Sequence, residues 1–215
     1  MRSFRRYLLD SLLEEYQHIL KGNVLDIGGK KIGKKGEFAP LVSQVNSWKY
    51  LNTDRATEPD YIGPVEEIPL NDGDIDSIII TEVLEYIKNV DLAFQEMYRI
   101  LSHNGKILCS VPLLHPIHGD YQDDRIRYTS VMLIEILNRN GFSVDIVRPM
   151  GSVGAVIYDI LRVSSGYAST HFMSRIFGRI LPVFFPLFLL IDKMTIKQSN
   201  FINTGYFIIA TKTTL

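Results

Sequence analysis

Residues 24–30 read Val-Leu-Asp-Ile-Gly-Gly-Lys, and this stretch constrains the fold more than any other. A short, mainly apolar run, which predicts a buried strand, carries Asp26 and ends at Gly28 and Gly29. Glycine has no Cβ atom, so the backbone at such a turn can pass close to a ligand. In α/β proteins these turns hold nucleotides, and an acidic side chain there accepts hydrogen bonds from ligand amino or hydroxyl groups. An ordinary strand-to-helix turn has the same pattern, so the choice depends on the rest of the chain.

The composition is that of one globular domain. The 215 residues are 46% hydrophobic and 22% charged, and nothing in the chain requires a second core. A formal net charge of -1 creates no field that attracts nucleic acid, so we expect no nucleic-acid partner. The single cysteine, Cys109, excludes an internal disulfide and is expected in the core. Acidic residues interrupt the apolar stretch after the N-terminal arginines, so we expect no export signal.

Apolar residues recur with the spacing of alternating helices and strands. An amphipathic helix opens the chain and ends at Gly22, and further helices are expected at residues 39–45, 89–101 and 129–140. Asn89 and Thr129 are the expected N-caps of the last two helices. The alternation predicts an α/β fold. The expected strands cover residues 24–27, 48–54, 61–63, 75–80, 106–111, 142–147 and 206–211.

Polar side chains follow two more of these strands. Asp54 ends the second strand, where an acidic residue in a nucleotide-binding unit accepts hydrogen bonds from both ribose hydroxyls. Thr81 and Glu82 end the β-branched run 75–80, at the edge where open parallel sheets bind ligands. These positions favour the ligand interpretation of Asp26. The alternative for each carboxylate is that it only caps the turn that follows it.

Between residues 113 and 129 the pattern changes to a dense polar connection. A loop this polar at the binding edge is where we expect substrate chemistry. We expect no metal site, because two histidines are too few ligands and the carboxylates suit ion pairs equally well. The polar residues are His115, His118, Asp120, Tyr121, Asp123, Asp124, Arg125, Arg127 and Tyr128.

A long insertion, residues 149–203, separates the last two expected strands of what we interpret as a single domain, 1–215. Its most apolar part, residues 180–191, would span about 18 Å as a helix. A bilayer core is about 30 Å thick, so this segment is too short to cross it alone. Residues 176–192 could instead contact a membrane surface, pack on the domain or form a dimer face. The sequence leaves these three alternatives open.

Taken together, several segments resemble the class I S-adenosylmethionine-dependent methyltransferases. They are residues 24–29, 54, 65–70, 81–86, 99–101 and 104–106, and the likeness covers most of residues 20–150. Within that class the chain is similar to type 11 methyltransferases, and most similar to small enzymes of bacterial surface-polysaccharide and related glycan pathways. The segment that carries this closer likeness is Asp124-Arg125-Ile126-Arg127-Tyr128-Thr129.

The resemblance implies a Rossmann-like, seven-stranded mixed sheet with helices on both faces, whose last strand inserts antiparallel beside the sixth. It implies S-adenosylmethionine as the cofactor, and carboxylates suit the ammonium and sulfonium cations of that molecule. By the same correspondence, the methionine part would approach Asp26, Gly28 and Gly29, and the ribose would bind Asp54. Val65 and Glu66 would frame the adenine, and Thr81 and Glu82 would form the floor beneath the sulfonium.

Methyl transfer from a sulfonium is an in-line displacement, so the protein has to hold the acceptor and exclude water. A hydroxyl acceptor also loses a proton, and histidine is the side chain best suited to take it near neutral pH. His115 and His118 are therefore the candidate bases, with Asp120 or Asp124 as orienting groups. Arg127 is expected either to bind an anionic sugar or phosphate or to pair with a neighbouring aspartate.

We therefore expect O-methylation of a sugar or glycan intermediate in the cytoplasm. A lipid-linked acceptor at the inner face of the membrane would explain the apolar insertion. The rival interpretation is a non-catalytic, methyltransferase-like interaction or membrane-surface protein. A nicotinamide-dependent oxidoreductase is disfavoured, because no Gly-x-Gly-x-x-Gly motif follows the first strand. The identity of the acceptor, the methylated atom and the oligomeric state stay open.

Overall fold

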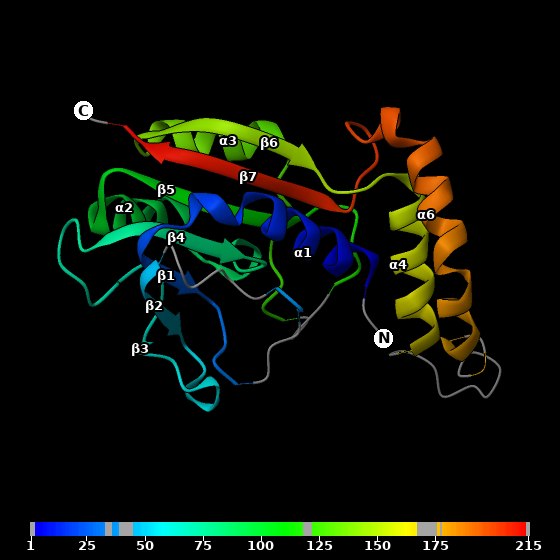
Figure 1. Ribbon diagram of the computed structural model, residues 1–215, viewed down its shortest axis with the longest axis horizontal. Coiled ribbons are helices and arrows are strands. Elements are labelled where there is room, and N and C mark those ends of the chain that lie inside the picture. The colour runs from blue at the N-terminus through cyan, green and yellow to red at the C-terminus, as the bar shows by residue number, and fades with distance from the viewer. Residues whose placement is uncertain are drawn as a thin grey trace.

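The computed structural model describes residues 3–32, 36–38, 45–117, 122–166, 176 and 178–213. Within them lies a seven-stranded sheet of order β3-β2-β1-β4-β5-β7-β6 (Figure 1). Neighbouring strands are parallel, except that β7 runs antiparallel to both β5 and β6. This is the expected Rossmann-like mixed sheet, with the last strand inserted beside the sixth.

The expected strands are confirmed, with shifts at their ends. The fifth strand starts five residues earlier than expected, at Leu101, because α2 (Val90–Ile100) ends there. Of the short helix expected at 39–45, Val45 begins β2 and the other residues lie outside the described part of the chain. The strands are β1 Gly22–Ile27, β2 Val45–Asn52, β3 Tyr61–Ile62, β4 Ile75–Thr81, β5 Leu101–Pro112, β6 Phe142–Pro149 and β7 Gly205–Lys212.

Helices cover both faces of the sheet, as successive residues of β4 show. Ile78 and Ile80 point to the face that α2 and α3 (Ser130–Arg139) cover, whereas Ile79 points to α1 (Phe4–Tyr16). Both faces of this central strand are thus excluded from solvent, which explains its continuous β-branched run. On the sheet face opposite α1, the core between the sheet and the helices α2 and α3 contains their side chains Ala93, Phe94, Met97, Leu133, Ile136 and Leu137. The core between the sheet and α1 contains Leu9 and Leu13.

Side-chain caps fix where these helices begin. The Asn89 side chain accepts a hydrogen bond from the backbone N–H of Leu92, and Thr129 accepts one from Met132. Both caps were expected from the sequence, because a short polar side chain satisfies an N–H group that has no partner in the first turn. Short 3₁₀ turns complete the connections: η1 Gln17–Ile19, η3 Arg55–Thr57 and η4 Leu84–Tyr86.

The insertion between β6 and β7 forms a helical hairpin beside the sheet. Its helices α4 (Val153–Gly166) and α6 (Phe185–Met194) lie side by side near the N-terminal end of α1, at the end of the sheet where β5 stops (Figure 1). The buried side chains of Phe4, Tyr158 and Leu181 join the hairpin to α1. Among the described helices, none is long and apolar enough to cross a membrane. The hairpin also contains η5 Leu181–Phe184 and η6 Ile196–Gln198.

Candidate active site

The carboxyl ends of β1, β2, β4 and β5 meet at one edge of the sheet. In register, Ile27 of β1 lies between Leu51 of β2 and Ile80 of β4. The polar residues that follow these strands therefore gather at the edge where parallel sheets bind ligands. The sequence predicted this convergence for the residues around Asp26, Asp54 and Glu82.

The turn after β1 is held by its neighbours. Gly28 has a φ of +76°, and a Cβ added there would lie 2.3 Å from Cγ2 of Val83. A Cβ on Gly29 would lie 2.3 Å from the carboxyl carbon of Asp26. The Asn52 side-chain amide donates to the carbonyl oxygens of Gly28 and Gly29, at 3.2 and 3.0 Å. The positive φ and the contact with Val83 favour glycine at position 28, and the Asp26 side chain lies close to Gly29. Asn52, which the sequence analysis did not select, fixes the shape of the turn.

The other expected cofactor residues differ in their exposure. Asp54 is exposed and caps η3, with its Oδ1 accepting from the backbone N–H of Ala56 at 3.0 Å. A carboxylate has acceptor capacity beyond one such bond, so capping does not prevent Asp54 from binding a ligand. Val65 is buried, whereas Glu66 and Thr81 are half-buried.

Glu82 is bound by an arginine from the N-terminal helix α1. The Arg5 guanidinium pairs with both carboxylate oxygens of Glu82, and the Ser110 hydroxyl donates to Oε1 at 2.7 Å. Burial lowers the pKa of Arg5 to about 9, so the guanidinium stays charged at neutral pH. Glu82 also has a φ of +59°, a backbone region that is costly for residues other than glycine. Arg5 is a functional candidate that the sequence analysis missed.

Arg127 binds the neighbouring Asp124, as one of the two sequence alternatives expected. Its Nη2 donates to Oδ2 at 2.7 Å and its Nη1 donates to Oδ1, which makes the pair bidentate. The Asp124 side chain is fully buried, and its hydrogen bonds raise the pKa of Arg127. The Arg125 backbone N–H donates to the carbonyl oxygen of Glu85 at 3.0 Å, which joins this polar loop to η4.

His115 meets a carboxylate from the insertion. Its Nδ1 lies 2.9 Å from the carbonyl oxygen of Pro116, and its Nε2 lies 3.6 Å from Oδ2 of Asp159. A carbonyl oxygen only accepts, so Nδ1 is the protonated nitrogen in this arrangement. Asp159 is fully buried and accepts from the backbone N–H groups of Phe4 and Arg5, and burial raises its pKa.

No local sequence signal marked Asp159, because it lies in the apolar insertion far from the residues it binds. The other candidate base, His118, and the candidate orienting residue Asp120 lie outside the described residues. Within the described ranges, no three His, Cys, Asp or Glu residues group in a way that could hold a metal ion.

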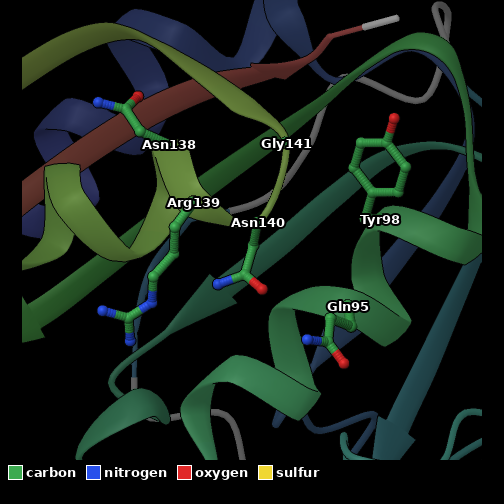
Figure 2. A pocket seen from close by; sticks show the side chains of 6 residues that line it. All are labelled: Gln95, Tyr98, Asn138, Arg139, Asn140 and Gly141. Carbon is green, nitrogen blue, oxygen red and sulfur yellow. The ribbon is translucent and has the colours of Figure 1, made fainter. Parts of the chain in front are cut away.

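A surface hollow of about 300 Å³ lies away from this edge (Figure 2). It is lined by the C-terminal ends of α2 and α3, next to the start of β6, and so it lies at the amino edge of the sheet. The glycine turn and Glu82 lie at the opposite, carboxyl edge. The hollow is therefore separate from the candidate active site.

Comparison with known proteins places the fold. Residues 42–109 match a sequence family described as the methyltransferase domain, and no curated protein matches the chain. Among solved structures, an S-adenosylmethionine-dependent methyltransferase from Archaeoglobus fulgidus is similar, with a TM-score of 0.57 and 16% identity, over 96% of this chain and 94% of that one.

Two further similar structures carry different acceptors. The geranyl diphosphate C-methyltransferase from Streptomyces coelicolor A3(2), solved with Mg²⁺, geranyl diphosphate and S-adenosyl-L-homocysteine, has a TM-score of 0.60 and 9% identity, over 95% of this chain and 76% of that one. Phosphoethanolamine N-methyltransferase 2 from Haemonchus contortus has a TM-score of 0.57 and 16% identity, over 97% of this chain and 52% of that one. The chain thus has the fold of S-adenosylmethionine-dependent methyltransferases, and the match over 42–109 together with this fold supports S-adenosylmethionine as the cofactor.

Proposed function

We propose that the protein is an S-adenosylmethionine-dependent methyltransferase that methylates a hydroxyl group of a sugar or glycan intermediate. The observation that carries this proposal is the convergence of the glycine turn, exposed Asp54 and Glu82 at the carboxyl edge of the sheet. Asp26, Gly28 and Gly29 would hold the methionine part of the cofactor, and Asp54 the ribose. Val65, Glu66 and Thr81 complete the proposed cofactor site. The bound cofactor supplies an activated methyl group.

On the acceptor side, His115 is the proposed general base. The Asp159 carboxylate, 3.6 Å from Nε2, would stabilise the imidazolium that forms when the imidazole takes a proton. His118 stays the second candidate base. The pair of Asp124 and Arg127 is the proposed contact for polar or anionic groups of the acceptor, because the bidentate bond to Asp124 uses only some of the five N–H donors of the guanidinium, and the others could bind a phosphate or carboxylate.

Calorimetry with S-adenosylmethionine tests the cofactor proposal. We expect the wild type to bind, and Asp54→Ala to weaken binding at least about tenfold, because two hydrogen bonds to ribose hydroxyls are lost. Glu14→Ala is the matched control, since Glu14 is an exposed carboxylate on α1 away from this edge. Absence of binding by the wild type would refute the methyltransferase proposal. Formation of S-adenosylhomocysteine with a panel of sugar and sugar-phosphate acceptors then tests the acceptor class.

The hairpin supports a second element of the proposal, contact with a membrane surface through residues 176–192. Val183, Leu187 and Leu190 project from η5 and α6 with exposed fractions of 74%, 50% and 55%, and Met194, two residues beyond this segment, continues the same face with an exposed fraction of 76%. Their spacing places them on one side of the helix. We define these four residues as the hairpin patch. Exposed apolar side chains grouped on one side of a helix are a candidate contact surface, and they support this element of the proposal.

The charges around the hairpin patch favour an anionic lipid surface as the occupant. Arg179, Lys193 and Lys197 are exposed, and the one acidic residue within 178–201, Asp192, is buried. Its Oδ1 accepts from the backbone N–H groups of Ser152 and Ala155, so this carboxylate faces the interior. Exposed apolar side chains flanked by cations, without an exposed carboxylate, suit the negatively charged cytoplasmic leaflet.

Membrane contact would bring the active site close to a lipid-linked acceptor. The hairpin stands at the same end of the sheet as the carboxyl edge (Figure 1). Membrane contact would also fit the rival function, a non-catalytic membrane-surface protein. That rival predicts lipid binding without cofactor binding, so the calorimetry above separates the two.

Liposome flotation tests the contact. We expect the wild type to float with vesicles that contain anionic lipid. The double variant Val183→Asp/Leu190→Asp should remain unbound at the bottom of the gradient. Val131→Asp is the matched control, because Val131 is 63% exposed on α3, outside the hairpin. Equal flotation of wild type and double variant would reject membrane contact. A second copy as the occupant would instead give a wild-type dimer, and a monomeric double variant, by size-exclusion chromatography with light scattering.

A further inference from the structure

We propose that Arg5 is a positioning residue that sets the place and charge of Glu82, and through them the floor of the cofactor site. The inference rests on the proposed function and adds a residue from α1 to it. Arg5 acts through Glu82 rather than on the ligand itself.

The two members of the pair differ in their access to a ligand. The side chain of Arg5 is 3% exposed and that of Glu82 is 13% exposed, so a molecule at the carboxyl edge meets the carboxylate. Arg5 lies behind it, against Gly205 at the start of β7, where an added Cβ would lie 3.0 Å from Nε. The guanidinium thus has a fixed place under the floor, and its fork geometry fixes both oxygens of the carboxylate.

The pair also holds an unfavourable backbone next to the glycine turn. Glu82 has its φ at +59°, and its backbone N–H donates to the carbonyl oxygen of Ser110 at 3.0 Å. The next residue, Val83, fills the space where Gly28 lacks a Cβ. A shift of Glu82 would therefore move Val83 and change the turn that the methionine part of the cofactor is proposed to approach. Strained backbone of this kind persists only where its surroundings hold it.

Charge gives a readout that a purely structural role would not change. S-adenosylmethionine has a sulfonium cation, whereas S-adenosylhomocysteine has a neutral sulfur at the same place. Removal of Arg5 leaves the Glu82 carboxylate without its counter-ion, which favours the cation. Replacement of Glu82 by glutamine leaves the guanidinium without its counter-ion, which disfavours the cation. The ratio of the two affinities therefore reports the net charge of the pair.

The test is calorimetry with both ligands at pH 8 on folded protein. Relative to wild type, we expect Arg5→Met to raise the preference for S-adenosylmethionine at least about fivefold, and Glu82→Gln to lower it by a similar factor. Arg5→Lys, which keeps the charge, should stay near the wild-type ratio. The double variant Arg5→Met/Glu82→Gln should return towards it. Arg139→Met, at the C-terminal end of α3 on the amino edge of the sheet, is the control and should leave the ratio unchanged, because the Arg139 side chain is 52% exposed and pairs with Asp91.

The outcomes separate this inference from the proposed function. Wild-type protein that binds neither ligand overturns both. Wild-type binding with unchanged ratios in Arg5→Met and Glu82→Gln overturns the role of Arg5 alone. If circular dichroism shows that Arg5→Met does not fold, Glu82→Gln decides, because glutamine can still accept hydrogen bonds from Arg5 and Ser110. A ratio in Glu82→Gln equal to that of wild type then overturns the inference.

Discussion

Asp159→Ala provides a quantitative test of how the hairpin is joined to the rest of the protein. Asp159 lies on α4 and is fully buried. Its Oδ1 accepts from the Phe4 backbone N–H at 2.7 Å, and its Oδ2 accepts from the Arg5 backbone N–H at 3.0 Å. These N–H groups belong to the first turn of α1, where they have no partner within the helix. The carboxylate therefore caps α1 from another helix.

The contacts allow the loss to be worked out. A hydrogen bond to a charged acceptor contributes about 1.5–3 kcal/mol, and alanine leaves two buried N–H groups without an acceptor. Burial raises the pKa of Asp159, and alanine relieves this cost of burying a charge, which offsets part of the loss. We therefore expect Asp159→Ala to lower the free energy of unfolding by about 3 kcal/mol.

Urea unfolding followed by circular dichroism measures this loss. Asp159→Asn keeps one side-chain oxygen as an acceptor but turns an amide NH₂ towards the other backbone N–H, so it should lose at least about half as much free energy. Asp123→Ala is the control, because Asp123 is 64% exposed and lies 3.7 Å from Arg125, so its loss should stay below about 0.5 kcal/mol. A loss below about 1 kcal/mol in Asp159→Ala would show that the capping argument is wrong.

Two further predictions concern acid stability and the glycine turn. Hydrogen bonds from Arg99 hold the pKa of Glu96 below its usual value, so its stabilising contribution is present above about pH 4.3 and is lost as the pH falls through the folded-state pKa. Melting temperatures from pH 6 to pH 3 should therefore show the gap between wild type and Glu96→Gln narrowing, and parallel curves would contradict this. Gly28 and Gly73 have nearly equal φ values of +76° and +77°, but an added Cβ at Gly73 meets nothing within 4 Å. Gly73→Ala should cost about 1 kcal/mol of unfolding free energy from backbone strain, and Gly28→Ala at least about 1 kcal/mol more from the clash with Val83, so equal losses would refute the packing argument.

The sheet and its helices could be predicted because their signals are local. The run from Ile75 to Ile80 indicates a strand covered on both faces, and the structure places α1 on one face and α2 and α3 on the other. Asn89 and Thr129 are short polar residues directly before apolar periodic segments, and both cap helices. The carboxyl edge then follows from the parallel strand order, so Asp26, Asp54 and Glu82 were placed together without knowledge of any contact.

The partners of these residues could not be predicted, because they are distant in sequence. Arg5 lies 77 positions from Glu82, and Asp159 lies 154 positions from Arg5. No spacing rule marks a residue whose role depends on how α1, β4 and α4 approach one another. Asn52 lies only two positions before the expected ribose ligand, Asp54. Its hydrogen bonds to the carbonyl oxygens of the glycine turn could still be found only from the structure.

This difference between local and long-range signals bears on the acceptor. Structures with the same fold at 9–16% identity carry geranyl diphosphate in one case and a phosphoethanolamine derivative in another, so the sheet does not specify what is methylated. In this chain, several polar groups outside the strands are joined by long-range contacts. Asp159 of the hairpin contacts His115 and the first turn of α1, and Arg5 of that turn pairs with Glu82. Acceptor specificity therefore has to be sought in this set of contacts, which links the proposed base, the hairpin and the floor of the cofactor site.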